Sequence, residues 1–438
     1  MIIYLAGLGP GSADLTTQQT MEALGEADLI ITSRRLAGML WGADPSVPYW
    51  DALREEDRFC FASGVRILVE TVPGKICRIL EEEPFERAVC LYGGDSSFYS
   101  GATPLLRLIG QSRPLQEKGA KIRILPGISS LSAACAHLGI SFRELEVFSA
   151  HGRVCNPVKA VMNGKRSFFL TGGKSDPAGL CAELTRAGLG DLKVTVCERL
   201  SSEQEQIREM TAREASGLKY DRMAVLLAEP APISEQLRRT VPGIPDDSFV
   251  RGSVPMTKRL VRVSALSLLD PSAEDLIWDL GAGTGSVSVE LSPRCGRVIS
   301  VEKDPEAIRL MEENRKKFGA WNMEIVQGEV PQILRDLPMP DRIFVGGGGG
   351  RIREVLEIIK TRLSGSGDCG QKTAEESRLP AICASAVTLE TLQEVRSVME
   401  ESGYETQVVQ VAVTDVKKRG HFHMMDAQNP VFLIAGFV

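Results

Sequence analysis

Short apolar runs separated by longer amphipathic stretches dominate the first half of the chain. Runs of this kind are typical of parallel strands that are buried on both faces. The stretches between them have the length of helices, and Thr16 with Gln19 three residues later predicts a capping box for the first helix. The alternation predicts parallel α/β layers. The predicted strands are residues 1–8, 29–32, 88–92, 121–125, 167–170, 193–197 and 223–228.

The same alternation resumes in the second half, after a stretch of a different kind. Between Glu229 and Pro255 the chain has five prolines and little periodicity, which is typical of a linker. Beyond it, seven apolar runs predict a mostly parallel sheet with a terminal hairpin, and residues 364–378 are a glycine-containing loop insertion. We therefore expect a domain at 1–235, a linker at 236–255 and a domain at 256–438. The predicted strands are residues 276–280, 298–301, 323–326, 342–345, 381–384, 406–413 and 431–437.

Composition excludes several classes of protein. The 438 residues are 43% hydrophobic and 25% charged with a net charge of -6, as in an ordinary globular protein. Neither half is globally basic, so we expect no nucleic-acid partner. Ten cysteines without a C-x-x-C pair, and only four histidines, argue against a zinc framework and fit reduced thiols. No apolar run is long enough for a membrane helix and no basic region precedes the first strand, so we expect a cytoplasmic protein without a membrane partner.

The most informative chemistry follows the first strand of the second half. Asp279 ends an apolar run, and Gly281, Gly283 and Gly285 form a loop before an amphipathic helix. Bare glycines let the backbone approach a ligand closely, and the helix N-terminus offers free N–H groups. Ser286 stands where the dinucleotide fingerprint needs a third glycine or alanine. The loop therefore resembles the first motif of S-adenosylmethionine (SAM) methyltransferases, and a glycine turn in another α/β protein is the alternative.

Two acids and a glycine run extend this predicted site. Glu302 ends the next strand, about 20 residues after the loop, where an acid would hold ribose hydroxyls. Glu329 follows the third strand, where an acid commonly addresses the adenine amine. Residues 346–350 are five glycines directly after a buried strand. In isolation such a run is a flexible linker, but at the carboxyl edge of a sheet we favour a role in shaping the site, with Arg351 or Arg353 orienting a substrate carboxylate.

Five motifs of the second half resemble the decarboxylating precorrin C15-methyltransferases. The resemblance runs from about residue 249 to residue 438, and the insertion at 364–378 departs from it. The motifs are MTKRLVR (256–262), WDLGAGTGSV (278–287), FVGG (344–347), AVTLETL (386–392) and NPVF (429–432). The resemblance implies SAM contacts from the glycine loop and from the threonine of the Thr-Lys pair. With the acids above, the expected cofactor-binding residues are Thr257, Gly281, Ala282, Gly283, Thr284, Gly285, Glu302, Glu329 and Val330.

Four motifs of the first half are similar to the tetrapyrrole methylase family. They are GLGPG (7–11), LYGGDSSFYS (91–100), LPGISS (125–130) and SAHGR (149–153), and the last one points to the branch that methylates C5 of precorrin. Pro10 lacks the backbone donor that a phosphate cradle would use. Ser96 and Ala150 depart from the family's usual residues without removing a donor or a charge. The resemblance implies a two-lobed fold that holds SAM through Pro10, Gly93, Gly94, Asp95, Phe98, Ser129, Ser130 and Leu170.

The candidate catalytic residues are few. A lone histidine near a strand end is more often structural than catalytic. The glycine and arginine beside His151 favour a function, so a structural and a catalytic role of His151 are equally open. His421 and His423 lack the cysteine or acid that would complete a metal site, so we expect no metal. Residues 417–419 are either a solvated turn or a contact for substrate carboxylates. The candidates are Asp95, His151, Arg153 and Arg351.

The two resemblances together imply one function. The second half would methylate C15 of a precorrin and decarboxylate the acetate at C12, and the first half would methylate C5. The sulfonium methyl of SAM is itself electrophilic, so the protein mainly has to align the reactants and exclude water. We expect two SAM sites, a precorrin substrate and a homo-oligomer. The alternatives are a fused SAM methyltransferase that acts on RNA or protein, and a cofactor-binding scaffold with one inactive half.

Overall fold

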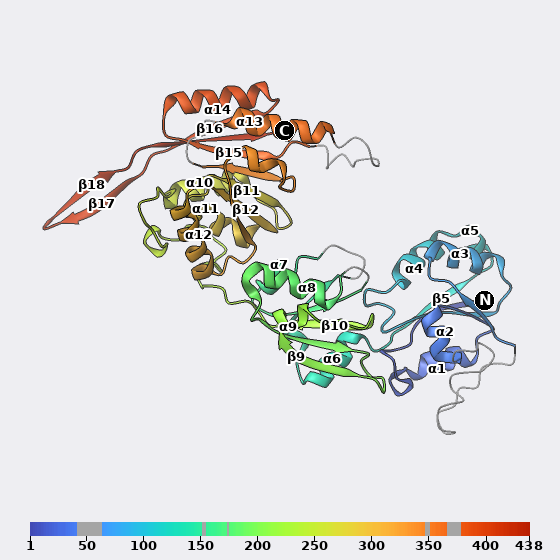
Figure 1. Cartoon of the computed structure of the whole chain (residues 1–438). Helices are drawn as coiled ribbons and strands as arrows, with labels where there is room; N and C mark the ends of the chain where they lie inside the picture. The colour runs from blue at the N-terminus through green and yellow to red at the C-terminus, as the bar shows by residue number, and fades with distance from the viewer. Residues whose placement is uncertain (42–63, 151–154, 173–174, 347–350, 366–377) are drawn as a thin grey trace. The chain divides into compact units, whose positions relative to one another are not determined.

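A computed structural model describes residues 1–41, 64–150, 155–172, 175–346, 351–365 and 378–438. These residues form two compact units. Figure 1 draws the whole chain with its helices and strands labelled. Unit 1 comprises Met1–Cys155, Arg166–Cys181 and Lys193–Ala228. Unit 2 comprises Asn156–Lys165, Ala182–Leu192 and Glu229–Val438. Two short segments from the first half of the chain therefore belong to the same compact unit as the second half.

The first sheet of unit 1 is fully parallel, as the apolar runs predict. Its strand order is β3-β2-β4-β1-β5, and Ile3 and Leu5 of the central strand are completely buried. Helices α1 and α2 cover one face, and α3, α4 and α5 cover the other. The predicted capping box is wrong by one residue, because Thr17 rather than Thr16 caps α1. The elements are β1 (Ile2–Gly7), α1 (Gln18–Gly25), β2 (Leu29–Thr32), α2 (Arg34–Trp41), β3 (Arg66–Val69), α3 (Pro73–Glu82), β4 (Arg87–Tyr92), α4 (Ala102–Gln111), α5 (Arg113–Glu117) and β5 (Lys121–Leu125).

The second sheet of unit 1 has the order β6-β7-β10-β8-β9 and mixes strand directions. Only β6 and β7 pair in parallel; the other pairs are antiparallel. The expectation of parallel layers is wrong for this sheet, because buried apolar runs do not reveal in which direction the strands pair. The prediction also missed β3, β6 and β9, which are edge strands whose partial exposure leaves no long apolar run. The elements of this stretch are α6 (Ser130–Leu138), β6 (Leu145–Ser149), α7 (Pro157–Val161), β7 (Arg166–Leu170), α8 (Pro177–Leu184), β8 (Lys193–Glu198), β9 (Gln206–Thr211), α9 (Ala212–Ser216) and β10 (Ala224–Ala228).

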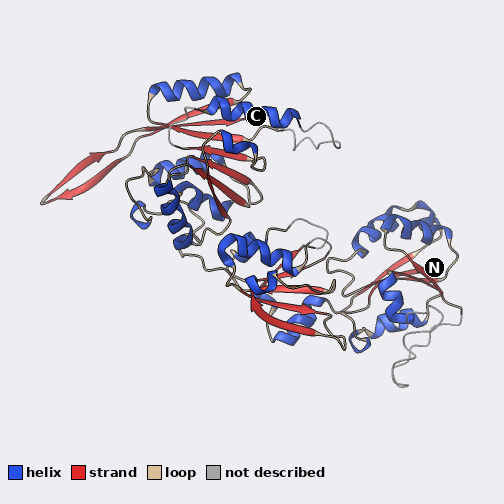
Figure 2. Cartoon of the chain, in the orientation of Figure 1, coloured by secondary structure: helices blue, strands red, loops and turns tan. Residues whose placement is uncertain are grey.

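Unit 2 contains the predicted seven-stranded, mostly parallel sheet. Its order is β13-β12-β11-β14-β15-β19-β16, in which β19 runs antiparallel to both of its neighbours. Helices α10 and α11 pack on one face of this sheet, and α13 and α14 pack on the other. In Figure 2 the red strands of the sheet lie between blue helices. The elements are α10 (Arg259–Leu269), β11 (Leu276–Leu280), α11 (Ser286–Leu291), β12 (Arg297–Glu302), α12 (Pro305–Phe318), β13 (Met323–Gln327), β14 (Arg342–Val345), α13 (Ile352–Gly365), β15 (Ala381–Ala386), α14 (Leu389–Glu401), β16 (Glu405–Val411) and β19 (Val431–Phe437).

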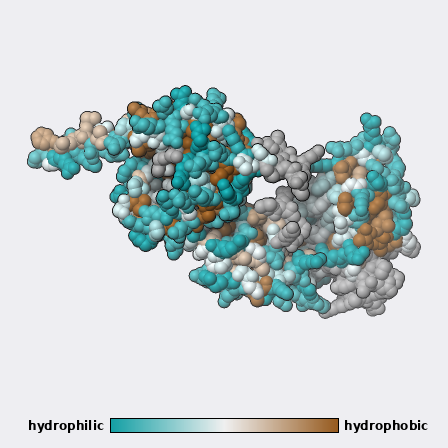
Figure 3. All heavy atoms as spheres, turned by 45° about the horizontal axis from the view of Figure 1, so that its top comes forward, coloured by the Kyte–Doolittle hydropathy of each residue, from teal (hydrophilic) through white to brown (hydrophobic). Residues whose placement is uncertain are grey.

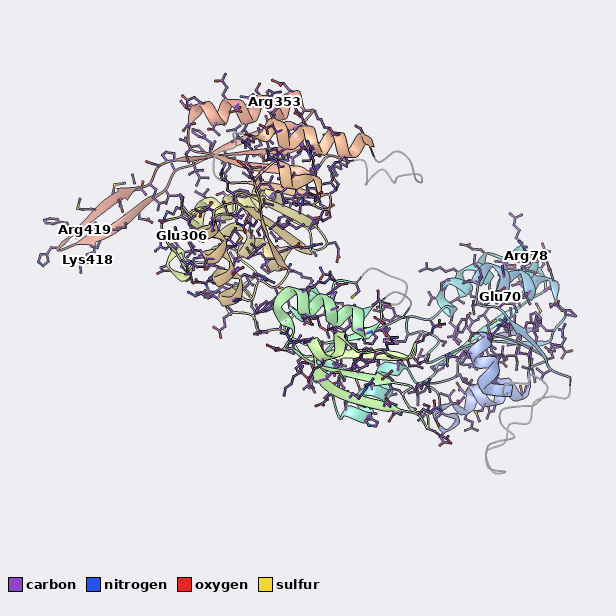
Figure 4. The ribbon with its side chains drawn as sticks, in the orientation of Figure 1. Glu70, Arg78, Glu306, Arg353, Lys418 and Arg419 are labelled. Atoms are coloured by element: carbon purple, nitrogen blue, oxygen red, sulfur yellow. The ribbon has the colours of Figure 1, made fainter. Side chains whose placement is uncertain are left out.

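A two-stranded arm leaves this sheet between β16 and β19. It consists of β17 (Thr414–Arg419) and β18 (Phe422–Ala427), and every residue of both strands is exposed. Residues 417–419 therefore lie in a strand and are not the turn that was one of the two predicted alternatives. Figure 3 shows both hydrophilic and more apolar residues along the arm, and Figure 4 places Lys418 and Arg419 near its tip.

Residues 229–250, which include part of the predicted linker, are packed onto unit 2. Leu237, Ile244 and Phe249 are buried in one apolar cluster with Met311 and Phe318 of α12. This segment therefore contributes to the core of unit 2 and is not a free tether.

A buried ion pair fastens the same segment to α10 and α11. Arg262 is fully buried, and its Nε donates to Oε1 of Glu290, which is 1% exposed, at 2.9 Å. The Nη1 of Arg262 also donates to Asp246 at 2.7 Å. Glu290 in turn accepts the backbone N–H groups of Gly243 and Ile244 at 2.6 and 3.1 Å. The pair therefore holds the segment in place through backbone and side-chain bonds together.

Candidate functional site

The glycine loop after β11 has a backbone that only glycine adopts easily. Gly281, Gly283 and Gly285 have φ values of +71°, +57° and +74°, in the left-handed region that disfavours residues with a Cβ. A Cβ on Gly285 would lie 2.6 Å from Cγ of Met311, and one on Gly281 would lie 3.0 Å from the Gly346 carbonyl oxygen. The loop is therefore held tightly against its neighbours and leaves its outer surface as bare backbone.

Glu302 lies beside this loop at the end of β12. Its Oε2 accepts the Gly283 N–H at 2.9 Å, and its Oε1 accepts the N–H of Lys303 at 2.8 Å. The same strand supports the loop as well, since the N–H groups of Gly281 and Ala282 both donate to the Val301 carbonyl. The structure thus brings together the glycine loop and the acid that was predicted to hold ribose hydroxyls.

Thr284 and the segment that contains Thr257 complete the surroundings of the loop. Thr284 is 1% exposed, and its Oγ1 has no hydrogen-bond partner among the described residues. Such an orphaned buried hydroxyl at a loop is a feature that a bound ligand can explain. A Cβ on Gly283 would lie 3.3 Å from the Pro255 carbonyl oxygen, so the segment before α10 borders the loop from the other side.

Sequence reasoning missed one residue that holds the loop, Asn314, and one that ties the helix after the loop to the sheet, Ser288. Asn314 of α12 is fully buried, and its Nδ2 donates to the carbonyls of Thr284 and Val250 at 3.0 Å each. Ser288 of α11 donates to Oδ2 of Asp279 and lies 2.7 Å from the Ser300 hydroxyl. A lone asparagine or serine within a helix gives no sequence signal, because its partners are distant in the chain.

Asp279 lies in the core behind the loop. Burial raises the pKa of its carboxyl to about 7, against the opposing effect of the Ser288 hydrogen bonds. Its Oδ1 has no partner among the described residues. Asp279 therefore links β11 to α11, the helix that follows the loop.

Glu329, Val330 and Arg351 lie together beyond the end of β13. The Nη1 of Arg351 donates to the Val330 carbonyl at 3.0 Å and lies 3.6 Å from Oε1 of Glu329. Lys303 lies 3.5 Å from the same Glu329 oxygen. Arg353 instead pairs with Glu401 at 3.0 Å. The expected adenine-side residues are thus neighbours of Arg351, while residues 347–350 of the glycine run lie outside the described residues.

In unit 1, three glycine-containing loops meet at the carboxyl ends of β1, β4 and β5. Gly9 and Gly94 exchange two backbone hydrogen bonds, at 3.1 and 2.8 Å. A Cβ on Gly7 would lie 2.5 Å from the Gly94 carbonyl oxygen and 2.9 Å from the Gly127 nitrogen. The loops approach one another so closely that side chains are excluded, which leaves a surface built from backbone atoms.

The predicted residues of unit 1 fall on these loops and on the second lobe. Asp95 accepts the Ser97 N–H at 2.6 Å and also the Ser97 hydroxyl, in an Asx turn. Ser129 caps α6, whose first residue is Ser130. Phe98 and Leu170 pack against the apolar cluster that contains Phe168. Pro10 precedes Gly11, and a Cβ on Gly11 would lie 3.4 Å from the Leu200 carbonyl oxygen. His151 and Arg153 lie outside the described residues.

Replacing Asp95 by alanine should lower the methyl transfer that the family resemblance implies for this half about tenfold or more, because the loop would lose both hydrogen bonds that the Asp95 carboxylate accepts. Asp95→Asn, which can still accept the Ser97 N–H, is the matched control for the charge. Steady-state rates and the affinity for S-adenosylhomocysteine (SAH) check this. Unchanged values in the alanine variant would show that the turn has no part in the reaction.

Other kinds of site have no support in the described part of the chain. No group of three or more histidine, cysteine or acidic residues is arranged there to hold a metal ion. None of its helices is both long and apolar enough to cross a bilayer.

Comparisons with known proteins find a family for each half of the chain. A family model described as the precorrin methyltransferase domain matches residues 247–436, and one described as tetrapyrrole (corrin/porphyrin) methylases matches residues 2–216. A Sinorhizobium protein named precorrin-6Y C(5,15)-methyltransferase (decarboxylating) is 32% identical over 280 residues, which are 62% of this chain and 66% of that protein.

Two further relatives each match slightly less than half of the chain. A Pyrobaculum calidifontis protein named probable cobalt-precorrin-6B C(15)-methyltransferase (decarboxylating) is 39% identical over 201 residues, 45% of this chain and 96% of that protein. A crystal structure of precorrin-6y C5,15-methyltransferase from Geobacter metallireducens is 35% identical and covers 45% of this chain and 97% of its own, with a TM-score of 0.39.

The fold and the glycine-built loops define a methyltransferase with two different α/β units. The chain belongs to the precorrin methyltransferases, with a tetrapyrrole methylase domain ahead of a precorrin methyltransferase domain. It is an enzyme of cobalamin biosynthesis that uses SAM, and the predicted fold class is confirmed.

Proposed function

We propose that this chain is a bifunctional, decarboxylating precorrin methyltransferase. Residues 1–235 methylate C5 of precorrin-6B or its cobalt form. Residues 256–438 methylate C15 and remove the carboxyl group of the C12 acetate, and the product is precorrin-8. The names of the Sinorhizobium and Pyrobaculum relatives support this assignment.

One observation carries the proposal: each unit has its own glycine-built site at the carboxyl edge of a parallel sheet. In unit 2 the site is the loop at Gly281–Gly285 with Glu302, and in unit 1 it is the junction of Gly7, Gly94 and Gly127. Ligands of α/β sheets bind at this edge. Because the two sites are built from unrelated strands and loops, two independent cofactors are expected.

The residues of unit 2 suit SAM by their chemistry. Bare backbone at the glycine loop would accommodate the methionine part, Glu302 would accept hydrogen bonds from ribose hydroxyls, and Glu329 would accept one from the adenine amine. When bound, SAM supplies an electrophilic methyl group. The protein's own task is to orient a ring carbon of the substrate toward that methyl and to exclude water.

Decarboxylation is assigned to the same unit. The bond between the acetate methylene and its carboxyl carbon breaks, carbon dioxide leaves, and the electron pair enters the conjugated ring system. The former methylene carbon then takes up one proton from water and becomes a methyl group. The protein therefore needs only to position the carboxylate, and we assign this to the neighbourhood of Arg351. No residue with a separate redox or Schiff-base role is required.

The full chain should bind two molecules of SAH, one for each unit. Titration calorimetry on the intact chain measures this stoichiometry. Binding of a single molecule would favour a scaffold with one inactive half and would contradict the two-site assignment.

The reaction itself is tested with precorrin-6B and SAM. Mass spectrometry should show a product that has gained two methyl groups and lost one carbon dioxide. If the chain instead methylates RNA or protein and leaves precorrin unchanged, the proposal fails. Sedimentation of the same sample tests the predicted homo-oligomer.

The predicted cytoplasmic location is a separate proposal. The free cysteines of the described residues, most of them buried, fit this location.

A further inference from the structure

The carboxyl edge of the unit 2 sheet continues beyond the cofactor loop to β15. Strands β11, β14 and β15 are parallel and in register, so their ends share this edge. Gly346, directly after β14, contacts Gly281 of the cofactor loop. Val387, directly after β15, lies two strands from β11, at a distance of about 10 Å.

Two large apolar side chains are exposed at this end of β15. Val387 is 68% exposed and Leu389 is 67% exposed. The turn that carries them is well ordered by its own bonds, because Thr388 caps α14 by accepting the Thr391 N–H at 3.2 Å. A capped helix start that presents two neighbouring apolar side chains to solvent, at the ligand-binding edge of a sheet, indicates a contact with an apolar ligand surface.

A positively charged residue, Lys258, lies at the same edge, on the other face of the sheet. Lys258 is exposed, precedes α10, and follows the segment whose Pro255 carbonyl borders Gly283. It has no ion-pair partner among the described residues. Helix α10 packs on one face of the sheet and α14 on the opposite face, so Lys258 and the apolar pair flank the edge from two sides.

The charges distinguish the two sides. Glu390 is exposed in the first turn of α14, next to Leu389, so carboxylates are repelled from the apolar side. A macrocycle with an apolar face and a rim of carboxylates would match this arrangement, with its face on the apolar pair and a rim carboxylate on the lysine.

We infer that Val387 and Leu389 form the surface on which the tetrapyrrole ring rests in the C15 site, and that Lys258 binds one of its rim carboxylates. The inference rests on the proposed function, since the ligand is its precorrin substrate. The ring is thereby held beside the cofactor loop, within reach of the methyl group.

The test uses the intact chain and the double variant Val387→Thr/Leu389→Asn, which keeps side-chain size and removes the apolar surface. The KM for precorrin in C15 methylation should rise about 10- to 100-fold. The affinity for SAH, measured by calorimetry, should not change. Val387→Ile/Leu389→Met, which restores apolar area, should return KM to within about threefold of the wild type.

Val438→Thr is the matched control. Val438 is 52% exposed and follows β19, whose end pairs with the beginning of β15, at the opposite edge of the sheet. Its KM should equal that of the wild type. Lys258→Ala should raise KM in a manner that high salt abolishes.

Three results would contradict the inference, and they differ in whether the proposed function fails with it. A wild-type chain that binds SAH but neither binds nor methylates precorrin would overturn the proposed function together with this inference. An active wild type and an unchanged KM in the double variant would overturn the inference alone. Loss of SAH binding in a folded double variant would assign the pair to the cofactor site and also overturn it.

Discussion

Gly283→Val is expected to abolish C15 methylation while C5 methylation continues. A valine at φ +57° is strained by its Cβ, and that Cβ would lie 3.3 Å from the Pro255 carbonyl, with two methyl groups still to place. The Gly283 N–H that Glu302 accepts would be displaced as well. We expect the Kd for SAH at this site to rise at least about 100-fold. Calorimetry should then detect one binding event per chain, and mass spectrometry one added methyl group.

Gly403→Val separates backbone strain from loss of the site. Gly403 has φ +94°, and a Cβ added to it would have no other atom within 4 Å, so a valine there is strained without touching a neighbour. This variant should bind two molecules of SAH and methylate both positions. C15 methylation that survives in Gly283→Val would disprove the assignment of the glycine loop.

Glu290→Ala is expected to lower the free energy of unfolding of unit 2 by about 3–5 kcal/mol. The substitution leaves the fully buried guanidinium of Arg262 without its 2.9 Å partner, and the N–H groups of Gly243 and Ile244 lose their acceptor. Chemical denaturation followed by tryptophan fluorescence measures the effect, because Trp278 is completely buried in this unit.

Two comparisons define the result. Arg262→Met/Glu290→Leu removes both charges and should recover much of the loss. Arg353, which is labelled in Figure 4, forms an exposed ion pair with Glu401. Arg353→Ala breaks this pair and should leave the denaturation midpoint unchanged. A shift in Glu290→Ala as small as the one in Arg353→Ala would contradict the idea that the buried pair fastens residues 229–250.

The fold was predictable where strands are buried on both faces. β1, β4, β11, β12 and β14 are continuous apolar runs, and their order along the chain matches the prediction. The arm β17–β18 was not predictable as a hairpin, because all of its residues are exposed and no core imposes a period on them. The packing of residues 229–250 was also missed. Its three buried apolar residues, Leu237, Ile244 and Phe249, are irregularly spaced among prolines and form no helical or strand pattern.

The site was predictable where chemistry resides in local sequence. The glycine loop and the acid at the end of β12 were predicted from their spacing, and the structure brings Gly283 and Glu302 within hydrogen-bond distance. Asn314 and Ser288 escaped prediction because Asn314 reaches the loop, and Ser288 reaches Asp279, only after α12 and α11 are packed. A burial effect such as the raised pKa of Asp279 likewise requires the folded core.

The grouping of residues 156–165 with unit 2 bears on how the chain is made. Asn156 donates to the Gly296 carbonyl at 2.9 Å and Lys159 to the Ser292 carbonyl at 3.1 Å, across 140 and 133 positions of sequence. At ribosomal speeds of about 5–20 residues per second, these partners emerge on the order of ten seconds after Asn156 and Lys159 do. During that interval these two hydrogen bonds at the start of α7 cannot form. The packing of residues 156–165 is therefore completed only after the second half has been synthesised.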